Sequence, residues 1–206
     1  MTQVKICGLT RQEDIGAVNG YLPDFIGFVF APGSRRQVTI AQARLLKKQL
    51  DTRIKAVGVF TDETVPNITL LCKAKIIDMV QLHGDETAEF IQALKEKTSS
   101  PVIKAVRVRG REQILQAERF PCDFLLLDTY REGEYGGSGA TFDHALIPAL
   151  QKPFFLAGGL HENNIEQAVL SSRPFAVDVS SGAETDGFKD ERKIRKIIEI
   201  IKNIDY

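Results

Sequence analysis

Two residues able to transfer protons stand at the ends of apolar segments that have the composition of strands. Cys7 ends the segment Val4–Cys7, and Asp128 ends Phe124–Asp128. In α/β enzymes, reactive side chains gather where the carboxyl end of a strand turns toward a helix. A thiolate can remove a proton there, and a carboxylic acid can deliver one. The alternatives are an inert core cysteine and an acid that caps the following loop.

A second group of residues has the chemistry to bind anions. Arg35 and Arg36 follow the turn signal Pro32-Gly33-Ser34, and an arginine there could hold a carboxylate through two hydrogen bonds. Gly158-Gly159 and Ser180-Ser181-Gly182 follow the last two predicted strands. In a barrel these loops commonly bind phosphate, because glycine lets backbone N–H groups approach the anion closely. A solvated arginine pair and two tight turns are the alternatives.

Three more polar residues are candidates because of their positions. Lys5 lies two residues before Cys7 and shares its face of the strand, so an inward-facing Lys5 needs a partner, for which Asp178 is a candidate. As a lone histidine, His83 is interpreted first as a structural hydrogen-bonding residue. The sequence Tyr135-Gly136-Gly137-Ser138-Gly139 is either a flexible connector or a lid that closes beside Asp128.

Strand-like and helix-like segments alternate along the chain. Segments rich in β-branched and aromatic residues predict eight strands: Val4–Cys7, Phe25–Phe30, Ala56–Phe60, Met79–His83, Val102–Val106, Phe124–Asp128, Phe154–Ala157 and Phe175–Val179. Amphipathic segments predict helices at Ile40–Leu50, Val65–Ala74, Glu86–Lys97, Ile165–Leu170 and Lys193–Ile204. Thr10 and Glu13 have the spacing of a capping box, which predicts a further helix after the first strand.

Eight such units predict an α/β fold, a single (β/α)8 TIM barrel over residues 1–206 with short loops. No linker or low-complexity segment divides the chain. An open doubly wound sheet is the alternative. That fold would need a glycine-rich dinucleotide loop after the first strand, and Cys7-Gly8-Leu9-Thr10 is not one. In the barrel, all the candidate residues above would meet at one end.

Composition limits the kinds of partner. The chain has 206 residues, with 27 lysines and arginines against 27 aspartates and glutamates, so nothing favours nucleic acid or an anionic membrane. No apolar run is long enough to cross a bilayer, and the first residues lack the features of a secretory signal. Cys7, Cys72 and Cys122 form neither a zinc pattern nor a disulfide framework. We expect a cytoplasmic protein that uses no metal or other cofactor.

Taken in order, these motifs resemble phosphoribosylanthranilate isomerase from the first strand to the last. The segments that carry the resemblance are Val4-Lys5-Ile6-Cys7-Gly8, Gly27-Phe28-Val29-Phe30 with Ser34-Arg35-Arg36, Val80-Gln81-Leu82-His83-Gly84, Leu126-Leu127-Asp128, Tyr135–Asp143, Ala157-Gly158-Gly159-Leu160 and Arg173–Gly182. The family implies a barrel of the phosphosugar-binding type. It also implies an Amadori rearrangement in tryptophan biosynthesis, from N-(5-phosphoribosyl)anthranilate to 1-(2-carboxyphenylamino)-1-deoxyribulose 5-phosphate.

The resemblance also implies roles for individual residues. Cys7 matches the family's general base, Asp128 its general acid, and Arg36 the arginine that binds the anthranilate carboxylate. The loops Gly158-Gly159 and Ser180-Ser181-Gly182 match its phosphate site. Two alternatives stay open: a histidine-pathway aminoaldose isomerase, which uses two aspartates where this chain has Cys7, and a non-catalytic phosphate-binding barrel. Monomer and homodimer also both stay open.

Overall fold

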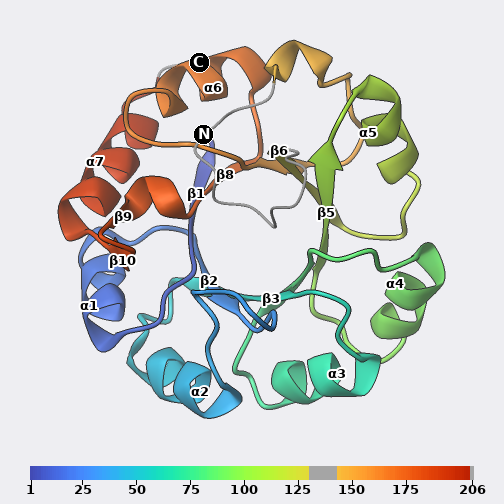
Figure 1. Ribbon diagram of the computed structural model, residues 1–206, viewed down its shortest axis with the longest axis horizontal. Coiled ribbons are helices and arrows are strands. Elements are labelled where there is room, and N and C mark those ends of the chain that lie inside the picture. The colour runs from blue at the N-terminus through green and yellow to red at the C-terminus, as the bar shows by residue number, and fades with distance from the viewer. Residues whose placement is uncertain (130–142, 205–206) are drawn as a thin grey trace.

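Eight parallel strands form a closed barrel, and helices surround it as an outer ring (Figure 1). The computed structural model describes residues 1–129 and 143–204. The strands pair in chain order, and β8 closes the barrel against β1. Their bounds are β1 Gln3–Cys7, β2 Phe25–Val29, β3 Lys55–Phe60, β4 Met79–Leu82, β5 Val102–Val108, β6 Phe124–Thr129, β7 Phe154–Leu156 and β8 Ala176–Val179. The predicted (β/α)8 barrel is therefore confirmed.

The outer ring contains α1 Gln12–Tyr21, α2 Ile40–Gln49, α3 Val65–Lys73, α4 Ala88–Lys95, α5 Arg111–Ala117, α6 Ile165–Ser172 and α7 Glu191–Lys202. A 3₁₀ turn, η1 (His144–Leu146), precedes β7. A second turn, η2 (Ser181–Ala183), and a hairpin of β9 (Glu184–Thr185) and β10 (Phe188–Lys189) follow β8. The sequence prediction lacks α5. Every helix in the described ranges is too short or too polar to span a bilayer.

Side-chain caps decide where two helices begin, and they correct the prediction. Arg11, not Thr10, is the N-cap of α1, and the capping carboxylate is Asp14, which accepts the Thr10 and Arg11 backbone N–H groups at 2.9 and 3.0 Å. Glu13 is exposed, so it cannot play this part. At α4 the Thr87 hydroxyl accepts from Phe90 N, which starts the helix two residues after the predicted Glu86.

Side chains alternate between the helices and the barrel interior along each strand. Outward residues such as Ile6 and Ile26 belong to the core between barrel and helices. Toward the amino ends of the strands, the interior is an aromatic core. There Phe155 lies 5.5–5.6 Å, between ring centroids, from Phe25, Phe124 and Phe175. The interior is therefore packed solid below the level at which polar side chains begin.

Lys5 begins that polar level and is completely buried, with an exposed fraction of 0%. Its Nζ lies 2.6 Å from Asp178 Oδ2 and donates to Gln81 Oε1 at 2.9 Å. The predicted pairing of Lys5 with Asp178 is therefore present. Burial alone would lower the pKa of Lys5, but the charges of Asp178 and Cys7 outweigh it and raise the pKa above its usual value. Lys5 consequently stays charged inside the barrel.

This pair predicts a large single-mutant effect on stability. Lys5→Met leaves the Asp178 carboxylate buried without its cation and should cost about 3–5 kcal/mol in the free energy of unfolding. The double variant Lys5→Met/Asp178→Asn removes both charges and should recover much of that loss. Urea unfolding measures both. As a control, Lys95→Met breaks a half-exposed pair with Asp123 and should cost no more than about 1 kcal/mol. Equal losses for Lys5→Met and Lys95→Met would contradict this account.

Candidate active site

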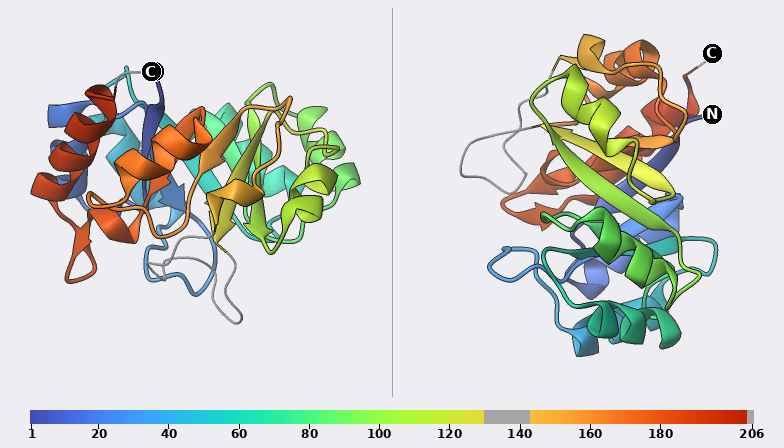
Figure 2. Two further views of the ribbon diagram at one scale, coloured as in Figure 1. Left: turned by 90° about the horizontal axis from the view of Figure 1, so that it is seen from above. Right: turned by 90° about the vertical axis from the view of Figure 1, so that its right-hand side faces the viewer.

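The carboxyl ends of the strands surround a cavity of about 570 Å³. The β2–α2 loop and the β9–β10 hairpin project from this end of the barrel, while the first residues of the chain lie at the other (Figure 2). The predicted site residues that line the cavity are Cys7, Arg36, His83, Asp128, Gly158, Gly159, Asp178, Ser180 and Ser181. Lys5 is buried beneath it, and Gly182 is not among its lining residues. The possible lid Tyr135–Gly139 lies outside the described residues.

Cys7 ends β1 with its side chain toward the cavity and only 8% of its surface exposed. Gly27 is its neighbour on β2, and a Cβ at that position would lie 2.5 Å from Cys7 Sγ. The glycine therefore creates the space that the sulfur occupies. Burial raises the pKa of the Cys7 thiol, while the ammonium groups of Lys5 and Lys189 act in the opposite direction. A thiolate formed here has two lysines to stabilise it.

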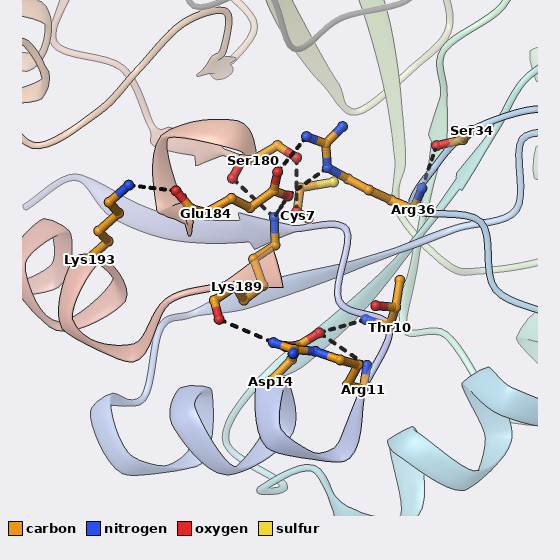
Figure 3. A network of polar contacts seen from close by, with 10 residues as sticks. All are labelled: Cys7, Thr10, Arg11, Asp14, Ser34, Arg36, Ser180, Glu184, Lys189 and Lys193. Carbon is orange, nitrogen blue, oxygen red and sulfur yellow. Dashed lines mark hydrogen bonds and ion pairs between the residues drawn. The ribbon is translucent and has the colours of Figure 1, made fainter. Parts of the chain in front are cut away.

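Arg36 is held by a buried carboxylate that sequence reasoning missed. Glu184 accepts hydrogen bonds from Arg36 Nε at 2.6 Å and from Nη2 at 2.7 Å (Figure 3). Burial alone would raise the pKa of Glu184, but Arg36 and Lys189 outweigh it and hold that pKa below its usual value. The Nη1 group of Arg36 has no partner among the described residues. Its outer edge, Nη1 with Nη2, is therefore still available for a carboxylate ligand.

Lys189 is the second functional residue that the sequence prediction lacks. Its Nζ lies 2.5 Å from Glu184 Oε1 and donates to the carbonyl of Ser180 at 3.0 Å (Figure 3). The Ser180 hydroxyl in turn donates to the carbonyl of Cys7 at 3.1 Å. The hairpin after β8 is thus fixed to β1 and to Arg36. Two-residue strands have no detectable periodicity, so only the Asp186-Gly187 turn signal marks this hairpin in the sequence.

Asp128 is the second-last residue of β6 on the other side of the cavity, with β7 and β8 between it and β1. Its Oδ1 accepts the backbone N–H of Thr129 at 2.8 Å, and its Oδ2 lies 3.3 Å from His83 Nε2. His83 Nδ1 is 2.9 Å from the amide of Gln81. His83 therefore contacts the candidate acid directly. The sequence, in which His83 is interpreted first as a structural hydrogen-bonding residue, does not predict this contact.

The loops after β7 and β8 pack against each other. Gly158 and Gly159 have φ angles of +88° and +63°, which favour glycine. A Cβ at Gly182 would collide with the carbonyl of Leu160, so this glycine serves the contact between the two loops. Asn164 holds the first loop by donating to the carbonyl of Gly159 at 2.9 Å. Gly158, Gly159, Ser180 and Ser181 are thereby brought together at the cavity wall.

A closed (β/α)8 barrel with a thiol, a carboxylate and glycine-rich loops around one cavity at its carboxyl end belongs to the barrel enzymes. The model of the family described as N-(5'phosphoribosyl)anthranilate (PRA) isomerase matches residues 4–200. The N-(5'-phosphoribosyl)anthranilate isomerase of Endomicrobium trichonymphae is 46% identical over 204 residues, which cover 99% of this chain and 100% of that one. This chain belongs to the phosphoribosylanthranilate isomerase family.

Solved structures agree with that assignment. The crystal structure of phosphoribosyl anthranilate isomerase from Thermotoga maritima has a TM-score of 0.87 and 35% sequence identity, with 99% of this chain and 100% of that chain covered. A phosphoribosyl anthranilate isomerase in complex with reduced 1-(o-carboxyphenylamino)-1-deoxyribulose 5-phosphate has a TM-score of 0.84 at 33% identity, with the same coverage. Of the functions left open by the sequence, the isomerase of tryptophan biosynthesis is therefore the one supported.

The space beside Cys7 gives a test of the site geometry. Gly27→Ala places a methyl group 2.5 Å from Cys7 Sγ, so the thiol must move. Turnover should fall by about 10-fold or more, since misplacing a reacting group by about 1 Å can cost 10²-fold. As a matched control, Gly16→Ala in α1 meets nothing within 4 Å and should add about 0.5–1 kcal/mol of stability with normal turnover. Normal turnover in Gly27→Ala would show that the position of Cys7 does not matter.

Proposed function

We propose that Cys7 is the general base and Asp128 the general acid of the phosphoribosylanthranilate isomerase reaction in this chain. The proposal rests mainly on one observation: both side chains line the same cavity. Cys7 lies on β1 and Asp128 on β6, and β7 and β8 separate these two strands. A sugar bound between them would have one group on each side. General acid–base catalysis of this kind typically contributes roughly 10²–10⁴-fold to the rate.

The proposed chemistry proceeds in three steps. Asp128 delivers its proton to the ring oxygen of the aminofuranose, the C1′–O bond breaks, and an iminium ion forms. The C=N⁺ group acidifies the proton on C2′, which the Cys7 thiolate removes, and the electron pair of that bond gives an enolamine. Tautomerisation of the enolamine gives the aminoketose. At the end Cys7 carries a proton and Asp128 is ionised, so the enzyme must exchange protons with solvent before the next turnover.

Two anchors would align the substrate between these groups. The phosphate is proposed to bind between Gly158-Gly159 and Ser180-Ser181, where glycine and a turn of helix expose backbone N–H groups. The anthranilate carboxylate is proposed to bind the outer edge of Arg36, because Glu184 occupies the inner one. Fixing both ends of the substrate supplies the orientation that the proton transfers need.

The setting of the enzyme is part of the same proposal. Residues 1–206 would act as one barrel domain, which the pairing of β8 with β1 supports. A reducing cytoplasm is supported by three free thiols, at Cys7, Cys72 and Cys122, one of which is the proposed base.

The role of Cys7 can be tested with a serine. Cys7→Ser keeps the size of the side chain but has a far higher pKa, so kcat should fall by about 10²-fold or more with little change in KM. Because burial raises the pKa of the thiol, kcat/KM of the unaltered enzyme should also increase with pH across the neutral range. Cys72→Ser, on α3, is the matched control and should be fully active. Near-normal turnover in Cys7→Ser would remove Cys7 from the mechanism.

Asp128 and Arg36 are proposed to act in chemistry and in binding respectively. Asp128→Asn keeps the shape but cannot deliver a proton, so kcat should fall while a product analogue still binds. Arg36→Met loses the carboxylate contact, so KM should rise more than kcat falls. For a charge-assisted pair worth roughly 1.5–3 kcal/mol, the rise in KM should be about 10–150-fold. Glu184 keeps Lys189 as a partner in that variant. Steady-state kinetics of both variants, with binding of the product analogue measured in parallel, show which residue acts in chemistry and which in binding. A binding defect in Asp128→Asn with kcat intact would reverse the two roles.

A further inference from the structure

Four side chains, those of Lys5, Gln81, His83 and Asp128, form a continuous series across the barrel interior. Lys5 Nζ donates to Gln81 Oε1 at 2.9 Å, and Gln81 Nε2 lies 2.9 Å from His83 Nδ1. His83 Nε2 then lies 3.3 Å from Asp128 Oδ2. Gln81 stands in the middle of the series with an exposed fraction of 1%.

The chemistry of Lys5 fixes which way the amide of Gln81 points. An ammonium group has three donors and no acceptor, so the Gln81 atom that faces Lys5 must be the carbonyl oxygen. The NH₂ group of Gln81 therefore faces His83. Amide and histidine orientations are normally ambiguous, but here the buried lysine decides between them.

The orientation of Gln81 then fixes the proton on His83. An amide NH₂ only donates, so His83 Nδ1 must present its lone pair. A neutral imidazole with an unprotonated Nδ1 has its proton on Nε2, which is the nitrogen 3.3 Å from Asp128. A proton on Nδ1 would face the N–H of Gln81 with no acceptor, so both the other tautomer and the imidazolium are disfavoured.

We propose that Gln81 is a positioning residue that holds His83 as the neutral Nε2–H tautomer, with its N–H directed at the carboxylate of Asp128. The consequence for catalysis rests on the proposed role of Asp128 as the acid. When Asp128 gives up its proton, the N–H of His83 is in place to stabilise the carboxylate left behind. Hydrogen bonds that are long in a substrate-free site commonly tighten in the complex. Among the described residues, Arg107 Nη2 also donates to the His83 carbonyl at 3.2 Å, and the charges of Lys5 and Asp178 lie beyond Gln81.

The test is the protonation of the His83 ring, read from ¹⁵N chemical shifts and long-range ¹H–¹⁵N couplings at neutral pH. The chain has three histidines, and the signals lost in His83→Gln identify those of His83. The expected wild-type spectrum shows a protonated Nε2 and an unprotonated Nδ1. A wild-type His83 with its proton on Nδ1, or doubly protonated, overturns the proposal without any variant of Gln81.

Gln81→Glu supplies the second arm, because a carboxylate of the same shape accepts from Lys5 and from His83 alike. The His83 proton should move to Nδ1, or both nitrogens should be protonated, and kcat should fall by about 10-fold or more while KM stays within about 3-fold. Gln116→Glu on the exposed face of α5 is the matched control and should change neither the His83 spectrum nor the kinetic constants. An unchanged His83 spectrum in Gln81→Glu overturns the proposal. A switched tautomer with normal kcat overturns the part of the proposal in which the His83 N–H supports turnover, whereas the acid role of Asp128 is decided separately by Asp128→Asn.

Discussion

A single ammonium group in the barrel interior organises the working end of this molecule. Lys5 is fully buried, and the cost of removing its charge from water is offset by Asp178 and by the carbonyl of Gln81. The same charge acts in two directions. Toward β1 it opposes the effect of burial on the Cys7 thiol, and toward β4 it fixes the orientation of Gln81 beside His83. Both sides of the cavity therefore depend on one residue that does not line it.

A second cluster of charged side chains builds the cavity wall beside Cys7. Glu184 is shared by Arg36 and Lys189: the bonds to Arg36 connect the hairpin after β8 to the β2–α2 loop, and the bond to Lys189 joins β9 to β10 within the hairpin. One carboxylate between two cations fixes both of them and leaves the cluster with a net positive charge, which suits an anionic ligand. The arginine is thus held in one orientation before any ligand arrives, which lowers the entropic cost of binding a carboxylate at its outer edge.

The sequence was sufficient for the barrel and for the residues that follow strand periodicity. The inward-facing positions of the apolar strands include Lys5, Cys7, Asp128 and Asp178. In a closed barrel, side chains at such positions must meet in the interior. Glu184 and Lys189 could not be predicted in this way, because a short hairpin has no periodic pattern.

The sequence also did not show which of several nearby polar groups makes a given hydrogen bond. Thr10 with Glu13 has the spacing of a capping box, but the carboxylate of Asp14 reaches both backbone N–H groups and displaces that arrangement. Gln81 is similar: its place at the end of a strand was evident, while its function depends on which of its two polar atoms faces Lys5. The first choice is decided within one turn of helix and the second by a contact between β1 and β4, and residue spacing alone predicts neither.

The central claim is that Cys7 and Asp128 act on opposite sides of a substrate anchored at both ends. A crystal structure of this chain with reduced 1-(o-carboxyphenylamino)-1-deoxyribulose 5-phosphate bound tests it most directly. The account predicts the phosphate between Gly158-Gly159 and Ser180-Ser181, the carboxylate on the outer edge of Arg36, and C2′ of the sugar facing Cys7 Sγ. An analogue bound the other way round, with its carboxylate in the glycine loops or with C2′ facing Asp128, would contradict it.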